Sequence, residues 1–202
     1  EVGNKLTQTD AEGRTTTWTY DYYGRVLTRT LPELMSESFV YDDVARTVAH
    51  TDFNQKTNTT YIDNQGRVDH IDYHDGTSEA YTYWANGQVH TVTDQHGVTE
   101  TVYDDRDRLD YEIKPDGTRL DYEYDDVGNR EQVKVTRGLI TTVTDYTFDE
   151  LNRLETVTDA SGTTTYTYYD NGNLDTVTFP NGVVTNYDYN TVNQLTHLTT
   201  RN

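Results

Sequence analysis

The sequence repeats one short pattern nine times over its 202 residues. Each copy centres on an anchor residue, usually Asp, which two aromatic residues precede and a Gly and an Arg commonly follow. The anchors are Asp21, Asp42, Asp63, Trp84, Asp104, Asp125, Asp149, Tyr169 and Asn190, spaced 20 or 21 residues apart and once 24. A period this short is enough for one β-hairpin but not for a domain, so the chain must build its fold by stacking similar units.

Two aromatic columns run through the copies, three residues and one residue before the anchor. Because side chains alternate along a strand, both columns lie on one face, and mostly polar residues such as Thr17 and Thr19 occupy the other. This pattern predicts half-buried antiparallel strands. The column next to the anchor is the predicted aromatic ladder: Tyr20, Tyr41, Tyr83, Tyr103, Tyr124, Phe148, Tyr168 and Tyr189. A covered ladder would be structural, whereas exposed rows could stack on sugars.

Each anchor begins a chain reversal. Three residues after it stands Gly, Asn or Asp in eight copies, with Ala45 as the exception. These three types tolerate positive φ, and an Asp that caps its own turn before them indicates a type I turn with a bulge. A second turn follows in most copies, for example at Asp75-Gly76 and Asn181-Gly182, and such dipeptides favour two-residue hairpin turns. Nine copies with two strands each predict about 18 strands.

The aliphatic residues after the first turn leave one point open. They stand five and eight residues after the anchor, as Val68 and Ile71 do. A difference of three means either that a bulge intervenes or that the two residues face opposite ways. The predicted fold class is all-β in either case. We expect repetitive antiparallel β-hairpins in one continuous spiralling strip, as a partial hollow shell or β-solenoid, because long sheets twist.

The residue four positions after the anchor changes together with the anchor. Where the anchor is Trp84, Tyr169 or Asn190, the partner is Gln or Asn, and Asp125 with Asn129 is the one unmatched copy. Contact between Asp and Arg across each turn is the simplest cause. The predicted structural turn pairs are Asp21 with Arg25, Asp42 with Arg46, Asp63 with Arg67, Asp104 with Arg108, and Asp149 with Arg153. Five equal copies along a strip would be unusual for an active site, so we predict no catalytic residues.

Composition limits the partners. Hydrophobic residues make up only 33% of the chain, so a thick core is not expected. The formal net charge of −19 disfavours nucleic acid and anionic membrane surfaces, and no apolar stretch approaches the ~20 residues of a membrane span. The chain has no Cys, which leaves neither disulfides nor thiolate metal sites.

Two groups of residues have some features of metal sites. His70 and His74 have the spacing of a helical metal pair but fall in a predicted strand and turn. The run Asp104-Asp105-Arg106-Asp107 is acidic, but its Arg and the missing Gly-rich loop argue against calcium. Catalytic motifs such as a nucleophile elbow or a P-loop are absent from the sequence. We therefore expect no metal, no cofactor and no enzymatic activity.

The repeated motif resembles the YD repeat of the Rhs family. Residues 18–26 read W-T-Y-D-Y-Y-G-R-V and residues 122–128 read Y-E-Y-D-D-V-G, close to the family pattern Y-x-Y-D-x-x-G-R-L, and the likeness extends over residues 6–200. The family includes bacterial Rhs and WapA-type polymorphic toxins, the C component of insecticidal Tc toxins, and teneurins. The resemblance implies a hairpin strip that spirals into a hollow shell, which encloses a C-terminal effector in toxin members, and a secreted or surface-displayed parent protein. The chain lacks the family's Asp-Pro-x-Gly self-cleavage motif and a toxin domain.

From these features we expect a single repeat array over residues 1–202 that acts as a wall, scaffold or stalk. The start at Glu1 and the sole Met, Met35, suggest a piece of a longer protein. Expected partners are further repeats or the rest of the parent chain, with self-association through free sheet edges. The alternative function is a glycan- or surface-binding aromatic module. Choline-binding repeats, also aromatic hairpins, are the closest rival, although the chain has only two Trp.

Overall fold

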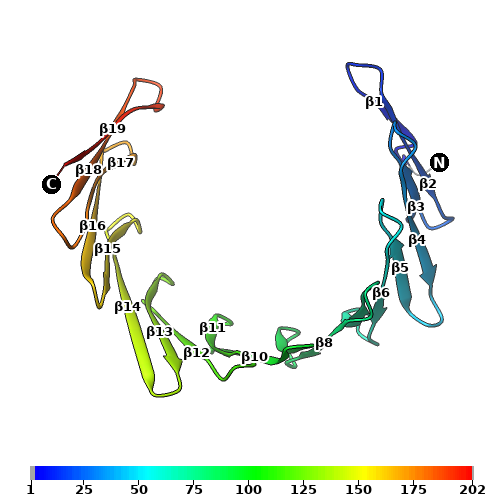
Figure 1. Ribbon diagram of the computed structural model, residues 1–202, viewed down its shortest axis with the longest axis horizontal. Helices are drawn as coiled ribbons and strands as arrows, with labels where there is room; N and C mark the ends of the chain where they lie inside the picture. The colour runs from blue at the N-terminus through cyan, green and yellow to red at the C-terminus, as the bar shows by residue number, and fades with distance from the viewer. Residues whose placement is uncertain (1–2, 202) are drawn as a thin grey trace. The chain divides into compact units, whose positions relative to one another are not determined.

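The computed structural model describes residues 3–201, which form nineteen β-strands and no helix (Figure 1). The predicted all-β series of antiparallel hairpins is confirmed. The strands are β1 (Thr7–Thr9), β2 (Thr15–Tyr20), β3 (Val26–Thr30), β4 (Ser36–Asp42), β5 (Thr47–Thr51), β6 (Thr57–Ile62), β7 (Val68–Asp72), β8 (Ser78–Tyr83), β9 (Val89–Asp94), β10 (Gly97–Tyr103), β11 (Leu109–Ile113), β12 (Arg119–Tyr124), β13 (Arg130–Arg137), β14 (Ile140–Phe148), β15 (Leu154–Asp159), β16 (Gly162–Tyr168), β17 (Leu174–Thr178), β18 (Val184–Tyr189) and β19 (Leu195–Arg201).

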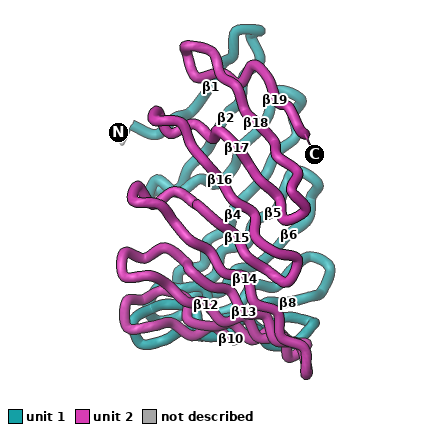
Figure 2. Tube along the Cα trace, turned by 90° about the vertical axis from the view of Figure 1, so that its left-hand side faces the viewer, with its two compact units in different colours: residues 1–99 teal, residues 100–202 magenta. Residues whose placement is uncertain are grey.

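The chain divides into two compact units, Glu1–Thr99 and Glu100–Asn202 (Figure 2). Within each unit, every strand pairs antiparallel with the strand that follows it in the chain. Each unit is thus a simple succession of hairpins. That the repeats act as one array over residues 1–202 stays a prediction.

A β-bulge explains why the two aliphatic columns stand three residues apart. Eight of the nine anchor hairpins shift register between the two residues just before the anchor. In the hairpin of β8 and β9, Tyr83 therefore lies opposite Val89, and Tyr81 lies opposite Val92. Directly opposed residues share a face, so both aliphatic columns lie on the aromatic face although three residues separate them.

The second turn of most repeats differs from the prediction of a two-residue turn. At Asp75-Gly76 the Tyr73 N–H donates to the Thr77 carbonyl and the Gly76 N–H to the Tyr73 carbonyl, the same bonds that close the anchor turns. Gly76 has φ 84° and supplies the bulge. Asp-Gly fits this five-residue turn as well as the two-residue one, because both need positive φ at Gly, so the dipeptide alone cannot distinguish them.

The polar face of the hairpins carries paired threonines. Their hydroxyls hydrogen-bond across the strands at 2.7–2.8 Å, and the pairs are Thr19 with Thr28, Thr82 with Thr91, Thr147 with Thr156, and Thr167 with Thr176. Cross-strand Thr pairs stabilise a sheet modestly without burying apolar area. The polar face can therefore remain exposed to solvent.

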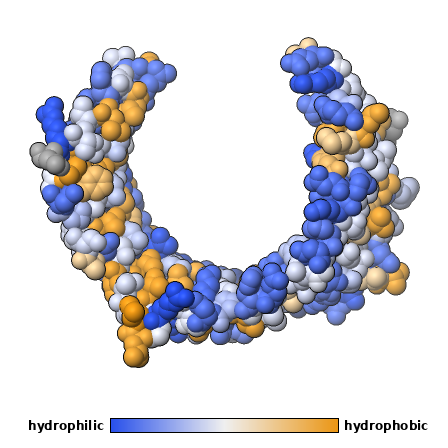
Figure 3. Space-filling model, viewed as in Figure 1, coloured by the Kyte–Doolittle hydropathy of each residue, from blue (hydrophilic) through white to orange (hydrophobic). Residues whose placement is uncertain are grey.

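Almost nothing in the molecule is fully buried. Among the described residues, only Val177 (5% exposed) and Thr185 (7%) are buried. On the face shown in Figure 3, hydrophobic residues are scattered among hydrophilic ones rather than gathered in one area. A chain without a core must be held by contacts between neighbouring strands, and these contacts define the candidate site.

One hairpin is longer than the rest. β13 has eight residues and β14 has nine, and Arg137 pairs with Ile140 across a two-residue turn at Gly138-Leu139. Leu139 at its tip is fully exposed. The 24-residue spacing between Asp125 and Asp149 is thus accommodated in a lengthened hairpin.

Candidate functional site

Four of the five predicted turn pairs are in contact. The guanidinium of each Arg lies 2.6–2.7 Å from a carboxylate oxygen of its Asp, and the pairs are Asp21 with Arg25, Asp63 with Arg67, Asp104 with Arg108, and Asp149 with Arg153. The other carboxylate oxygen accepts backbone N–H groups within the turn. In the second of these pairs, Asp63 Oδ1 accepts from Gln65 at 2.7 Å and from Arg67 at 2.9 Å. Each Asp thus fixes both the turn and its Arg.

These contacts set the electrostatics of the turns. The backbone N–H of Arg67, followed by its side chain, holds the carboxyl pKa of Asp63 below its usual value, although partial burial acts against this. Asp104 and Asp149 show the same direction with the same leading cause. At Asp21, burial is the largest influence and raises the pKa, but the bonds from Arg25 outweigh it, so the carboxyl pKa is still lowered. All four carboxylates are held in the charged form.

The prediction for Asp42 and Arg46 is wrong. Among the described residues these two do not contact each other: Asp42 Oδ1 accepts the N–H groups of Val44 and Ala45, and the Arg46 guanidinium donates to Asn64. Ala45 stands where other repeats have Gly, Asn or Asp, and the positive φ moves one residue on, to Arg46 at 54°. The hairpin then closes without a bulge, because Asp42 pairs directly with Thr47, and Arg46 points away from its Asp.

Two repeats keep the turn contact without Arg. Asn129 Nδ2 donates to Asp125 Oδ2 at 2.9 Å, and Asn190 Nδ2 donates to Gln194 Oε1 at 3.0 Å. An amide can therefore replace the guanidinium within the turn, but it is shorter and carries no charge.

In four repeats the tyrosine of the aromatic ladder is hydrogen-bonded to the repeat before it. The Tyr83 hydroxyl donates to the backbone carbonyl of Val68, five residues after the preceding anchor, at 2.6 Å. The same bond joins Tyr41 to Val26 at 3.0 Å, Tyr124 to Leu109 at 2.9 Å, and Tyr168 to Leu154 at 2.8 Å. Tyr20 likewise donates to the carbonyl of Lys5 at 2.7 Å.

The arginine of each turn pair covers the same tyrosine ring. The guanidinium carbon of Arg67 lies 4.2 Å from the ring centroid of Tyr83. The equivalent distances are 4.2 Å for Arg25 and Tyr41, 4.3 Å for Arg108 and Tyr124, and 4.5 Å for Arg153 and Tyr168. We call the Arg, the Tyr of the next repeat and the carbonyl that this Tyr reaches the inter-repeat lock. It occurs in full in these four copies.

All eight residues of the predicted aromatic ladder are half-buried. Burial raises the hydroxyl pKa of Tyr83, and the nearby Arg67 lowers it to a lesser extent. Tyr81, from the farther column, has its pKa raised to about 12, first by burial and then by Glu79. The ladder rings thus serve mainly as contacts between repeats.

The remaining candidate ligands lie apart from one another. The His70 ring stacks on Tyr61 with centroids 3.9 Å apart, and the backbone N–H of His74 donates to Asn58. Within residues 3–201, no three His, Asp or Glu side chains are grouped so that they could hold a metal ion. No helix in the described part of the chain could cross a membrane.

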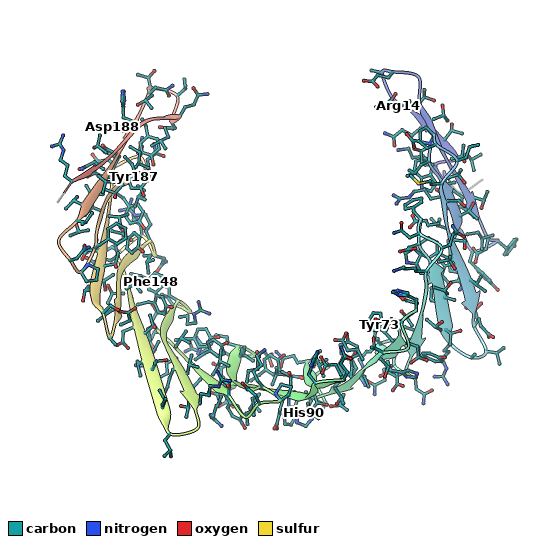
Figure 4. All side chains as sticks on the ribbon, viewed as in Figure 1. Arg14, Tyr73, His90, Phe148, Tyr187 and Asp188 are labelled. Carbon is teal, nitrogen blue, oxygen red and sulfur yellow. The ribbon has the colours of Figure 1, made fainter. Side chains whose placement is uncertain are left out.

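Two kinds of contact in the structure were not predicted from the sequence. Asp10 and Arg14 form a further turn pair, 2.8 Å apart, outside the nine anchors. Figure 4 labels Arg14, near the N-terminal end of the chain. The spacing Asp-x-x-Gly-Arg at residues 10–14 could have revealed it. The tyrosine hydroxyl bond gives a weaker signal, since it appears only as a constant offset of 14 or 15 residues between the ladder Tyr and an aliphatic residue.

Cavities lie beside several of the described turns. One has a volume of about 440 Å³ between the turns at Tyr169 and Asn190, and a second of about 340 Å³ has Arg25 and Tyr41 in its wall. The third, also about 340 Å³, lies beside Asp10 and Arg14. Only the first lacks an Arg in its lining.

Comparison with known proteins gives one family match and several similar solved structures. The RHS repeat family model matches residues 1–33. No curated protein matches the chain. Among solved structures, the chain is similar to a TcdB2-TccC3 crystal structure (12% identity, TM-score 0.40, 96% of this chain and 17% of that chain). It is also similar to a chain of the Photorhabdus luminescens Tc holotoxin pore (12%, 0.39, 94% and 17%) and to the TCP10 domain of Danio rerio CPAP in complex with a STIL peptide (14%, 0.27, 96% and 98%).

The chain thus spans about a sixth of the length of the Tc toxin chains. The family match covers the copy of the motif at residues 18–26, in which the Asp21 and Arg25 pair forms. The resemblance read from the repeated motif is thus confirmed over residues 1–33, where the chain matches an RHS repeat.

Proposed function

We propose that the chain is a structural segment of YD repeats that forms part of a wall in a large secreted or cell-surface protein of the toxin type. The observation that carries the proposal is the inter-repeat lock. The lock engages Arg and Tyr side chains in contacts between one repeat and the next. A binding or catalytic site would need these side chains to be free. A strip held in this way needs no core and can be lengthened by adding repeats.

The lock favours the wall over a glycan-binding module. A glycan would need free ring faces and free hydroxyls, but in four repeats the ladder Tyr has its face under an Arg and its hydroxyl on a carbonyl. The turn Asp residues are likewise paired with their Arg. We propose for the same reason that the chain has no enzymatic activity of its own, since the repeated Asp, Arg and Tyr side chains are engaged in contacts within and between repeats.

Photo-crosslinking in the intact parent protein tests the wall. A benzophenone amino acid is introduced at Thr156 on the polar face or at Val157 on the aromatic face, two neighbours on β15 that point to opposite sides. A wall predicts cross-links from one of the two positions to other segments of the parent chain. If both positions instead capture only cell-surface glycans, the glycan-binding alternative replaces the wall.

Location is tested separately. We expect protease added to intact cells of the source organism to degrade the parent protein, or the protein to be found in the medium. Degradation only after cell lysis would contradict a secreted or surface-displayed parent.

A further inference from the structure

The cavity of about 440 Å³ lies in the second unit, beside the repeat anchored at Tyr169. This repeat has neither an Asp–Arg turn pair nor the inter-repeat lock. Its lining comes from two hairpin ends: the turn between β16 and β17 and the turn between β18 and β19. The lining residues are Tyr169, Asp170, Asn171, Asn173, Asp188, Tyr189 and Asn190. Its volume is within the range of small-molecule sites, about 300–1,000 Å³.

Comparison with the preceding repeat shows what is missing from this space. There, the Arg153 guanidinium lies 4.5 Å from the ring centroid of Tyr168. In the next repeat the equivalent residues are Asn173 and Tyr189. The Asn173 side chain turns instead to Asn193, to which it donates at 3.1 Å, so no guanidinium covers Tyr189. The lining of the cavity thus includes Asn173 and Tyr189, the two positions that carry the turn Arg and the ladder Tyr in the complete repeats.

The lining supplies the chemistry that a guanidinium requires. Tyr169 and Tyr189 are arranged edge to face, with centroids 6.2 Å apart, and the Tyr169 hydroxyl is anchored to the Tyr187 carbonyl at 3.1 Å. The carboxylates of Asp170 and Asp188 line the cavity and form no ion pair with any described residue (Figure 4 shows Asp188 on β18). Aromatic faces and carboxylates both bind organic cations, and the net charge of −19 attracts them.

We propose that this cavity binds a guanidinium group, in the position that the turn Arg occupies in the complete repeats. The ligand class is an arginine-like organic cation, either free or carried by a peptide. The inference is independent of the proposed wall function, because the wall needs the locks of the other repeats and not this cavity.

The shape of a guanidinium suits this site better than that of an ammonium. Asn193 Oδ1 already accepts from both Asn171 and Asn173, at 3.0 and 3.1 Å, which fixes the amides at the rim. A guanidinium can stack on Tyr189 and direct its N–H groups toward carboxylates in the same plane, whereas an ammonium cannot do both at once. We expect arginine derivatives to bind more tightly than lysine derivatives.

The test is a titration of the folded chain with N-acetyl-arginine amide, followed by NMR of the Asn side-chain amides. We expect saturable shifts with a dissociation constant of about 1 mM, as for a partly exposed cation–π site. N-acetyl-citrulline amide, which has nearly the same shape without the charge, should bind at least tenfold more weakly. Equal binding of citrulline, or saturation by galactose without binding of arginine, would overturn the proposal.

Variants locate the site. Asn173→Arg should fill the cavity with the protein's own guanidinium and abolish binding, and Asn129→Arg, in a different repeat, is the matched control that should not. Tyr189→Leu should weaken binding at least fivefold, whereas Tyr189→Phe keeps the ring and should retain it. Unchanged affinity in Asn173→Arg, a substitution at an exposed turn that should fold, would contradict this location.

A second titration distinguishes the source of the group. Acetyl-Gly-Arg-Gly-amide adds backbone on both sides of the same side chain. Tighter binding of this peptide than of the free derivative would support a protein-borne arginine, and equal or weaker binding would support a free small molecule. Binding of neither would overturn the proposal.

Discussion

The repeats anchored at Asp42 and at Asp63 are adjacent in the chain and differ in whether the lock forms. In the second, Gly66 has φ 82°, Arg67 bonds to Asp63, its guanidinium covers Tyr83, and the Tyr83 hydroxyl reaches Val68. In the first, Ala45 replaces the glycine, Arg46 points to Asn64, and the following ladder position is Ile62.

The comparison shows that the residues of the motif depend on one another across two neighbouring repeats. The residue three positions after the anchor has positive φ at Gly66, and also at Asp107 and Asn152 in two other complete repeats, and it sets the direction in which Arg leaves the turn. Asp holds Arg there, and the Tyr of the next repeat packs against it. At Ala45 the positive φ moves on to Arg46, and neither the contact with Asp42 nor the contact with a ladder Tyr forms. Four substitutions test this interpretation.

The largest effect is expected for Tyr83→Ile, which makes the complete repeat resemble the incomplete one. It removes the hydroxyl bond to Val68 and the ring under Arg67, so we expect a loss of about 2 kcal/mol in the free energy of unfolding. Urea denaturation followed by Trp fluorescence measures it. As the matched control, Ile62→Leu should cost much less, and an equal loss in both variants would argue against the lock.

Gly66→Ala should cost about 1–2 kcal/mol. No atom lies within 4 Å of the added Cβ, so the cost comes from the left-handed backbone rather than from a clash. The reverse change, Ala45→Gly, should be neutral or stabilising. A crystal structure of Ala45→Gly in which Arg46 still points to Asn64 would show that glycine does not direct the Arg.

Tyr83→Phe should cost about 1 kcal/mol, because it removes the hydroxyl bond and leaves the ring in place. Thermal unfolding compares it with Tyr23→Phe at an exposed turn, which should be neutral. A neutral Tyr83→Phe would mean that the ring alone joins the repeats.

The smallest effect is the pH dependence of the turn pairs. The carboxyl pKa of Asp63 is lower in the folded state than in the unfolded chain, so folding releases protons in acid. The stabilisation is therefore complete above about pH 4 and is lost as the pH falls through the lowered pKa. Asp63→Asn should weaken this acid dependence in urea titrations between pH 2 and 6. Identical curves for both proteins would contradict the assigned pairing.

The sequence predicted the hairpins, the turn residues and four turn pairs because each is a local pattern that the repeats display many times. The predicted contact of Asp42 with Arg46 was wrong because Ala45, in place of Gly, changes how the turn closes. The spacing of Asp42 and Arg46 in the sequence does not reveal this change. The lock itself could not be predicted, since the contact of Tyr83 with Val68 depends on how adjacent hairpins align. The bulge was foreseen only as one of two options.

The hydrogen bond from the ladder Tyr hydroxyl to the preceding repeat also limits the length of a repeat. Where the lock is complete, the anchors that it joins lie 20 or 21 residues apart. Between Asp125 and Asp149, where Asn129 and Phe148 replace its two side chains, the interval grows to 24 and the hairpin lengthens to a protruding tip at Leu139. Where this hydrogen bond and the Arg contact are both absent, the hairpin can therefore accept insertions. Foreign loops grafted at this tip should leave the neighbouring hairpins in register.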